Sequence, residues 1–349
     1  MSNYFKNISK IEYKGKEGSD PLSFKYYNED QIVLGKPMKE HLRFATCYWH
    51  TFTWPGLDPF GGPTLDRPWM EKGDPVEKAE EKLNEAFDEL TQRPVPPDLN
   101  PGMKINGFEV ESLLVSSSKM QLYKAKDIAS SQLVALKTPS VNFEDDPQYL
   151  KNFMYEKWVG QRVQSPHVVK IYNNNEQSNF MAYAMEYIKG QTLREWMDQH
   201  PNPDIEVVVS FVKQIIQGLR AFHRQEMLHC DLKPENIMID EIGQIKLIDF
   251  GSARIAGVTE LVSPIHSTGN QGTQGYTAPE VILDGHVSQA ADQFSLGATV
   301  YEIFSGVLPY QDKLDKHLTV KRLSRLNDES ILMHNPSVPV WIDGAIRKA

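Results

Sequence analysis

The stretch His229–Asn236 reads HCDLKPEN, and Asp249-Phe250-Gly251 follows within KLIDFGSAR, thirteen positions after Asn236. Two carboxylates, an amide and a lysine in this order are suited to holding the phosphates of a nucleotide and a magnesium ion. A single tripeptide is a weak signal, but several motifs in a fixed order are specific. Residues 229–251 therefore decide how the rest of the chain is interpreted.

The composition is that of an ordinary globular protein with room for two domains. The 349 residues are 40% hydrophobic, and 37 Lys and Arg against 46 Asp and Glu give a net charge of −9, which argues against nucleic acid or an anionic membrane as the main partner. No apolar run approaches the roughly 18 residues of a spanning helix. Two cysteines, Cys47 and Cys230, suit a reducing compartment. We therefore predict a cytoplasmic protein of undetermined oligomeric state.

A proline-rich stretch, residues 93–102 (RPVPPDLNPG), is predicted to be an extended linker, because its four prolines fix φ and lack backbone donors. It separates residues 1–92 from residues 103–349. Strand-like segments dominate residues 103–188, and helices dominate residues 189–349. A small β-rich lobe followed by a larger helical lobe is an α+β pattern, with a ligand cleft expected between the lobes.

The motifs after the linker resemble those of the protein kinase family over residues 102–349. Val134-Ala135-Leu136-Lys137 resembles the strand that carries the phosphate-binding lysine, and Glu156 resembles its ion-pair partner. Lys233 in DLKPEN and Thr273 in GTQGYTAPE resemble the serine/threonine class. The resemblance implies a bilobal protein-kinase-like fold, ATP and Mg²⁺ as cofactors, and a protein Ser or Thr hydroxyl as the substrate.

The same resemblance gives each polar residue a role, because phosphoryl transfer needs positioning and charge neutralisation. The implied catalytic set is Lys137 on the α- and β-phosphates, Glu156 holding Lys137, Asp231 orienting the substrate hydroxyl and Lys233 on the γ-phosphate. Asn236 and Asp249 would ligate magnesium. His229 is interpreted as scaffold, and Asp292 in DQFSLG as the brace of the catalytic loop.

An adenine pocket is expected around the segment AMEYIKGQTL. Met185 would be the gatekeeper, and backbone groups of Glu186 and Ile188 would bind the adenine edge. The residues expected to cover the adenine faces are Leu122, Ala135 and Met238. The alternative is that these apolar residues are only core, but their register with the catalytic loop favours adenine contact.

The phosphate-covering loop departs most from the family, because LLVSSSKMQLYKAKD has no glycine where the family has G-x-G-x-x-G. Side chains at Val115, Ser117 and Met120 would keep the backbone farther from phosphates, and Ser117 is expected to donate its hydroxyl instead. Two interpretations stay open: an active kinase with a serine-rich lid, or a pseudokinase or scaffold with weak nucleotide binding. The retained charged residues favour activity.

Residues 3–90 resemble the N-terminus of xylose isomerase, through YNEDQIVLGKPMKEHLRFATCYWHTFTWPGLDPFGGPTLDRPW. An incomplete βα segment of a TIM barrel is expected, with a buried strand in 41–54 and an amphipathic helix in 76–90. Trp49 and Phe60 match residues at that family's sugar site. Its catalytic and metal-binding residues have no counterpart, so an inactive fragment, fused or mis-assembled onto the kinase, is implied.

Further stretches look closest to bacterial kinases that are fused to type 2C phosphatases: PPDLNPGMKINGFEVESLL, KTPSVNFEDDPQYL and IDFGSARIAGV. The phosphatase's metal-binding aspartates have no counterpart in residues 1–93. VPVWIDGAIRKA resembles the penultimate helix region of the large lobe, so a C-terminally truncated domain is expected. Cys230 replaces the arginine that binds a phosphorylated activation loop in many kinases, so that switch is not expected.

Overall fold

The computed structural model describes three strands within the first 90 residues and then residues 91–172, 179–255, 272–310, 313, 314, 318–323, 326 and 329–349. The chain divides into two compact units, Met1–Pro68 and Trp69–Ala349. The strands of the first unit form an antiparallel meander of β1 (Ile8–Tyr13), β2 (Phe24–Asn28) and β3 (Ile32–Gly35). The strand expected in 41–54, the helix expected in 76–90, Trp49 and Phe60 lie outside the described residues. The barrel-like segment therefore stays a prediction.

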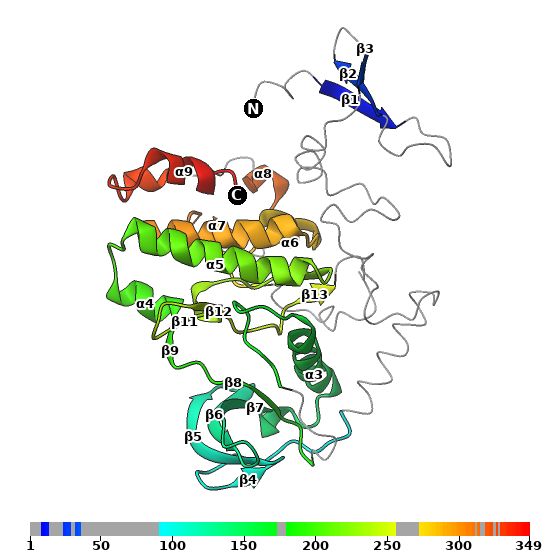
Figure 1. Cartoon of the computed structure of the whole chain (residues 1–349), viewed down its shortest axis with the longest axis vertical. Helices are drawn as coiled ribbons and strands as arrows, with labels where there is room; N and C mark the ends of the chain where they lie inside the picture. Colours follow the sequence, from blue (N-terminus) through cyan, green and yellow to red (C-terminus); the bar gives the residue numbers. More distant parts are fainter. Residues whose placement is uncertain are drawn as a thin grey trace. The chain divides into compact units, whose positions relative to one another are not determined.

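A five-stranded antiparallel sheet forms the small lobe of the second unit (Figure 1). Its strands, in spatial order, are β4 (Lys104–Ile105), β5 (Phe108–Ser116), β6 (Met120–Asp127), β7 (Leu133–Pro139) and β8 (Tyr183–Glu186). Residues alternate between the two faces of a strand, and Val134 and Leu136 of β7 point into the small-lobe core. Ala135, between them, belongs to the main core of the molecule. The alternate residue Lys137 shares the face of Ala135.

The proline-rich stretch packs along the small lobe. The Pro94 carbonyl accepts a hydrogen bond from the Met181 N–H at 2.9 Å, and the Leu99 N–H donates to the Tyr123 hydroxyl at 3.1 Å. Pro96 and Leu99 are buried. Prolines limit its backbone to extended conformations, as expected, but these residues belong to the small lobe and do not form a free spacer.

The turn between β4 and β5 is tied to a distant part of the chain by Asn106. Its φ of 48° is a left-handed conformation that asparagine tolerates better than most residues. Its side-chain amide donates to the Phe180 carbonyl at 2.8 Å, and its side-chain oxygen accepts from the Asn179 N–H at 3.0 Å. The first hairpin is thereby fixed to the segment that leads into β8.

One helix, α3 (Pro147–Arg162), accompanies the small-lobe sheet. The Asp146 carboxylate caps it by accepting from the Tyr149 N–H at 3.0 Å, and Pro147 occupies the first turn, where its missing N–H costs nothing. Glu156 is among its buried residues.

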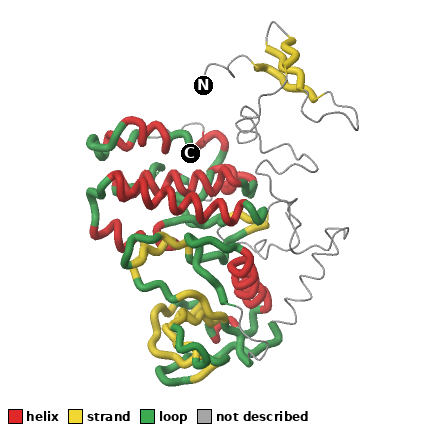
Figure 2. Tube along the Cα trace, viewed as in Figure 1, coloured by secondary structure: helices red, strands yellow, loops and turns green. Residues whose placement is uncertain are grey.

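The large lobe is mainly helical (Figure 2). Its described helices are α4 (Leu193–Gln199), α5 (Ile205–His223), α6 (Pro279–Asp284), α7 (Gln289–Ser305), α8 (Val320–Leu323) and α9 (Val340–Ile346). In α5 the buried apolar residues recur at helical spacing: Val208, Phe211, Ile215, Leu219 and Phe222. α7 is buried on nearly all sides and lies beside α5 (Figure 1). None of the described helices is both long enough and apolar enough to cross a membrane.

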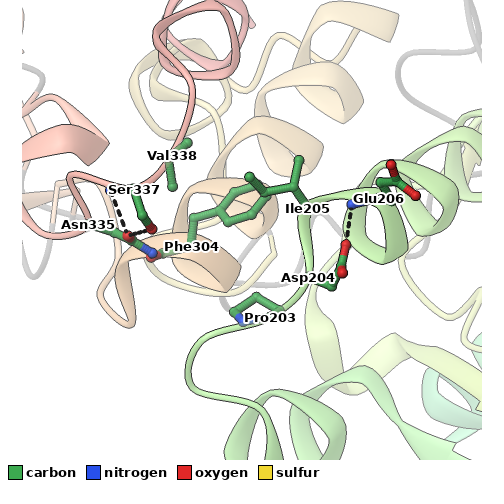
Figure 3. A pocket seen from close by; sticks show the side chains of 8 residues that line it. All are labelled: Pro203, Asp204, Ile205, Glu206, Phe304, Asn335, Ser337 and Val338. Atoms are coloured by element: carbon green, nitrogen blue, oxygen red, sulfur yellow. Dashed lines mark hydrogen bonds between the residues drawn. The ribbon is translucent and has the colours of Figure 1, made fainter.

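The start of α5 borders an open surface pocket of about 530 Å³ (Figure 3). The Asp204 carboxylate accepts from the Glu206 N–H at 2.7 Å and caps the helix there. Phe304 and Ser337 line the pocket as well, but none of the residues that the sequence singled out for chemistry does. The pocket is therefore separate from the candidate site.

Short strands carry the motif loops. β9 (Gly190–Thr192), β11 (Ile237–Asp240) and β12 (Ile245–Leu247) form one sheet, and β10 (Met227–Leu228) pairs with β13 (Arg254–Ile255). The 3₁₀ helices in the described residues include η1 (Val141–Phe143), η2 (Pro234–Asn236) and η5 (Ile331–Met333). HCDLKPEN thus lies between β10 and β11, and Asp-Phe-Gly lies between β12 and β13. The bilobal α+β architecture predicted from the sequence is confirmed.

Candidate active site

Lys137 and Glu156 form a buried ion pair between β7 and α3. The register of the sheet places Lys137 opposite Leu122 and Tyr183, and its Nζ lies 2.6 Å from Glu156 Oε1. Burial disfavours the charged lysine, but the nearby charges of Glu156 and Asp249 outweigh burial and raise its pKa. Lys137 is therefore a fixed cation, and the structure brings together the two residues that the sequence pairs.

The catalytic loop holds Asp231 from several sides. Asn236 Nδ2 donates to the Asp231 backbone carbonyl at 2.8 Å and to its Oδ2 at 3.0 Å. Lys233 Nζ lies 2.9 Å from the same carboxylate. Pro234 starts η2, whose single turn brings Asn236 back toward Asp231. Asp231, Lys233 and Asn236 thus form one cluster.

Thr273 completes this cluster from a distant part of the chain. Its hydroxyl donates to Asp231 Oδ1 at 2.7 Å and accepts from Lys233 Nζ at 2.7 Å. The sequence identified Thr273 only as a marker of the serine/threonine class. Its direct contact with the catalytic loop was missed, although its place in GTQGYTAPE was the signal that could have indicated it.

Asp249 is half-buried in the turn that follows β12. Its Oδ1 accepts from the Gly251 N–H at 2.9 Å, and a Cβ at Gly251 would come within 3.3 Å of that oxygen. Burial would raise the pKa of Asp249, but the charge of Lys137 and the Gly251 N–H outweigh it and lower this pKa. Phe250, 1% exposed, packs against Phe222 with ring centroids 5.4 Å apart. Asp249 is therefore an ionised carboxylate on a firmly packed turn.

Asp292 of α7 braces the catalytic loop by binding its backbone N–H groups. Its carboxylate accepts from the His229 N–H at 3.0 Å and the Cys230 N–H at 2.9 Å, and lies 2.8 Å from His223 Nε2. Cys230 has a φ of 64°, so these bonds hold a left-handed turn that a non-glycine residue rarely adopts.

His229 and Cys230 are themselves poor candidates for chemistry. Burial lowers the pKa of the His229 imidazole, and burial followed by the charge of Asp292 raises the pKa of the Cys230 thiol well above its usual value. A neutral imidazole and a protonated thiol fit the scaffold role expected for this part of the loop.

Leu122, Ala135 and Met185, expected around adenine, lie on the three neighbouring strands β6, β7 and β8. Ala135 is opposite Met185 in the sheet, and Leu122, Ala135 and Ile188 pack in the same apolar cluster. Met238 is half-buried on β11, opposite Thr192. Leu122, Ala135 and Ile188 therefore belong to one apolar cluster, and the contact of these residues and of Met238 with adenine stays a prediction.

Glu186, the last residue of β8, uses part of its hydrogen-bonding capacity within the protein. The Glu186 N–H donates to the Lys170 carbonyl at 2.8 Å, and the Glu186 carboxylate lies 2.9 Å from Lys246 Nζ. Of the backbone groups expected to bind adenine, the Glu186 N–H is thus already paired.

The glycine-free lid is the β5–β6 hairpin. β5 shifts register between Val110 and Ser112 and again between Leu113 and Val115, and these bulges supply a bend without glycine. The Ser117 hydroxyl donates to the Met120 carbonyl at 3.0 Å and accepts from the Met120 N–H at 3.0 Å. This hydroxyl closes the turn of the hairpin. Its expected contact with phosphate stays a prediction.

Comparison with known proteins agrees with this geometry. Residues 109–342 match the family model described as the protein kinase domain. The chain is 27% identical over 249 residues to the serine/threonine-protein kinase PrkC of Bacillus subtilis, covering 71% of this chain and 38% of PrkC. It is 31% identical over 217 residues to the serine/threonine-protein kinase PknL of Mycobacterium tuberculosis, covering 62% of this chain and 53% of PknL. The chain thus spans about half or less of these relatives.

A solved structure shares the fold. The kinase domain of Mycobacterium tuberculosis PknI matches with a TM-score of 0.53 at 23% identity, covering 71% of this chain and 89% of that domain. A separate stretch of 96 residues is 50% identical to xylose isomerase of Photobacterium profundum, covering 28% of this chain and 22% of that enzyme. The ion pair, the catalytic-loop cluster and the family match over residues 109–342 together establish that the chain belongs to the protein kinase domain family.

Proposed function

We propose that the chain is a serine/threonine protein kinase that transfers the γ-phosphate of ATP to a Ser or Thr hydroxyl of a protein. The observation that supports this most is the intact set of charged groups, with Lys137 paired to Glu156 and Asp231 joined to Lys233, Asn236 and Thr273. A packed fold alone does not require buried charges, which are costly to keep unless they are paired and used.

Each residue then acts by position and charge. Lys137, held by Glu156, binds the α- and β-phosphates, and Lys233 neutralises the γ-phosphate. Asp231 accepts a hydrogen bond from the substrate hydroxyl and orients it for in-line attack. Serine and threonine as acceptors are supported by Thr273, whose hydroxyl binds both Asp231 and Lys233.

The residues present fit magnesium. Asn236 Nδ2 donates to Asp231, so its side-chain oxygen is the atom that faces away and suits a cation, together with the Asp249 carboxylate. Magnesium prefers such oxygen ligands, and one or two from the protein suffice when phosphates supply others. In the described part of the chain, no three His, Cys, Asp or Glu side chains cluster as a metal site, in keeping with this sparse type. When bound, the ion neutralises charge that develops on the phosphate oxygens.

The test is transfer of labelled γ-phosphate to a serine- and threonine-containing acceptor protein, followed by phosphoamino-acid analysis. Asp249→Asn should lower the rate about 100-fold or more, because it removes the carboxylate charge that would hold magnesium at the reacting phosphates. Asp198→Asn, an equal change at an exposed position on α4, is the control and should leave the rate unchanged. Transfer that is unaffected by Asp249→Asn would refute the assignment.

The lid favours a second candidate, a pseudokinase or scaffold. Its hairpin has no glycine, and Leu113 and Val115 are 51% and 46% exposed. A pseudokinase would transfer no phosphate, either as the wild type or as the Asp198→Asn control. Its melting temperature would rise with MgATP only if it still bound the nucleotide weakly.

The remaining proposals concern the rest of the chain. We propose a kinase domain that includes residues 94–102, and we keep the xylose-isomerase-like segment as an inactive fusion. Kinship with kinases of the phosphatase-fused type is supported by the stretches KTPSVNFEDDPQYL and IDFGSARIAGV. The proposed partners are ATP and a protein substrate. The proposed location is the cytoplasm, which contains ATP and is reducing.

A further inference from the structure

The tip of the lid, residues 117–120, is a closed turn. Within it the Ser117 N–H donates to the Met120 carbonyl at 2.9 Å, and the Ser117 hydroxyl bonds both the N–H and the carbonyl of Met120. Backbone and side chain together leave this turn little freedom. The tip therefore moves as a unit, and whatever holds one of its groups holds the lid.

One carbonyl at this tip, that of Lys119, accepts two hydrogen bonds from outside the hairpin. The Ser140 N–H donates to it at 2.8 Å, and the Tyr149 hydroxyl donates to it at 2.5 Å. A carbonyl has two lone pairs, so its capacity is filled. Ser140 caps η1, and Tyr149 lies in the first turn of α3, so both donors come from the stretch between β7 and the start of α3.

Tyr149 is held in place and stays a donor. Its ring packs on Phe143 with centroids 4.6 Å apart. Burial raises its pKa to about 12, with Lys137 opposing the shift and Glu156 adding to it, so the hydroxyl keeps its proton near neutral pH.

The same helix carries both contacts. Tyr149 and Glu156 are seven residues apart, which is about two helical turns and brings them to the same face of α3. A shift of α3 away from the sheet would therefore break the Glu156–Lys137 pair and the Tyr149–Lys119 hydrogen bond together. The structure couples the position of the lid to the ion pair.

We propose that Tyr149 is a positioning residue that latches the glycine-free lid to α3 and so orders the lid for the nucleotide's phosphates. This inference rests on the ATP site proposed above. A lid with side chains in place of glycines has less backbone freedom to fold onto phosphates, and a lid that is already ordered loses less entropy on binding. By ordering the lid in advance, the latch offsets the backbone freedom that a lid without glycines lacks.

The test compares Tyr149→Phe with Tyr172→Phe. Each removes one hydroxyl from a small-lobe tyrosine, and the Tyr172 hydroxyl accepts from Gln132 Nε2 at 2.8 Å, away from the lid tip. Dissociation constants for MgATP and for adenosine are measured by calorimetry, and amide exchange of the peptide spanning 117–121 is measured without nucleotide. Adenosine lacks the phosphates, so its binding reports only the adenine pocket.

We expect Tyr149→Phe to raise the dissociation constant of MgATP about 2- to 12-fold, the loss of one hydrogen bond, and to leave adenosine unchanged. The Met120 amide should exchange faster in Tyr149→Phe alone, and Tyr172→Phe should match the wild type. Equal weakening of MgATP and adenosine would overturn the latch, since it would indicate a generally loosened cleft. Unchanged MgATP affinity or unchanged exchange would overturn it too. A wild-type protein that binds neither compound would refute the ATP site itself.

Discussion

Gly160 reports how tightly α3 packs against the Asp-Phe-Gly segment. A Cβ at Gly160 would lie 2.3 Å from Ile171 Cδ1 and 2.7 Å from Phe250 Cε2, well inside van der Waals contact. Because Phe250 is 1% exposed and directly follows Asp249, its ring cannot move without disturbing the turn that carries this carboxylate.

We expect Gly160→Ala to have a lower free energy of unfolding than Gly344→Ala. Both glycines lie inside helices, so each change gains about 1 kcal/mol of helix propensity, and nothing lies within 4 Å of a Cβ at Gly344. The gain cancels in the comparison, and the difference is the overpacking cost of about 1–3 kcal/mol. Urea denaturation followed by circular dichroism measures it.

Phosphate transfer provides a second measurement on the same pair of variants. It should fall in Gly160→Ala, whose clash reaches the Asp249 turn, and not in Gly344→Ala. If Gly160→Ala were as stable and as active as Gly344→Ala, α3 and Phe250 would not be packed as described, and the reasoning would fail.

Three further predictions concern other parts of the kinase domain. A chain that begins at Met103 lacks the buried Pro96 and Leu99 and should be about 2–4 kcal/mol less stable in chemical denaturation than one that begins at Pro94; equal stability would contradict this packing. The pKa of Asp249 is lowered in the folded protein, so its stabilising contribution is complete above the ordinary value of 3.8 and is lost as the pH falls through the folded value. In acid titrations below about pH 4, the unfolding free energy of Asp249→Asn should therefore fall less steeply than that of the wild type. Arg194→Lys should lower stability by about 1–3 kcal/mol in thermal melts, because one ammonium cannot replace the guanidinium that binds Glu235, Glu302 and the Tyr276 hydroxyl; an unchanged melt would contradict this.

The fold and the charged residues were predictable from sequence because their signals are local. Strand-like and helical segments separate along the chain, and Asp231, Asn236 and Asp249 lie in short motifs of fixed order. Lys137 and Glu156 are 19 residues apart in sequence, and their pairing followed from the family resemblance.

Contacts between a side chain and a distant backbone group were not predictable. The Tyr149 hydroxyl binds the Lys119 carbonyl, and a carbonyl has no sequence signature because every residue has one. The turn-closing role of Ser117 was not predictable for a related reason: a serine hydroxyl that closes its own turn and one that reaches a ligand look the same in sequence. The packing of residues 94–99 was missed because proline indicates an extended backbone and not what that backbone touches.

The hydrogen bond between Asn106 and Phe180 has a consequence for folding during synthesis on the ribosome. Its two ends are 74 residues apart, whereas Leu99 meets Tyr123 after only 24. At about 5–20 residues per second on a ribosome, the first hairpin waits roughly 4 to 15 seconds for the segment that completes it. During that interval the apolar face of β5, with Phe108 and Val110, has no β8 segment to help enclose its core. The nascent small lobe is therefore most exposed to aggregation before residue 180 emerges, and we expect chaperones to bind the growing chain during that interval.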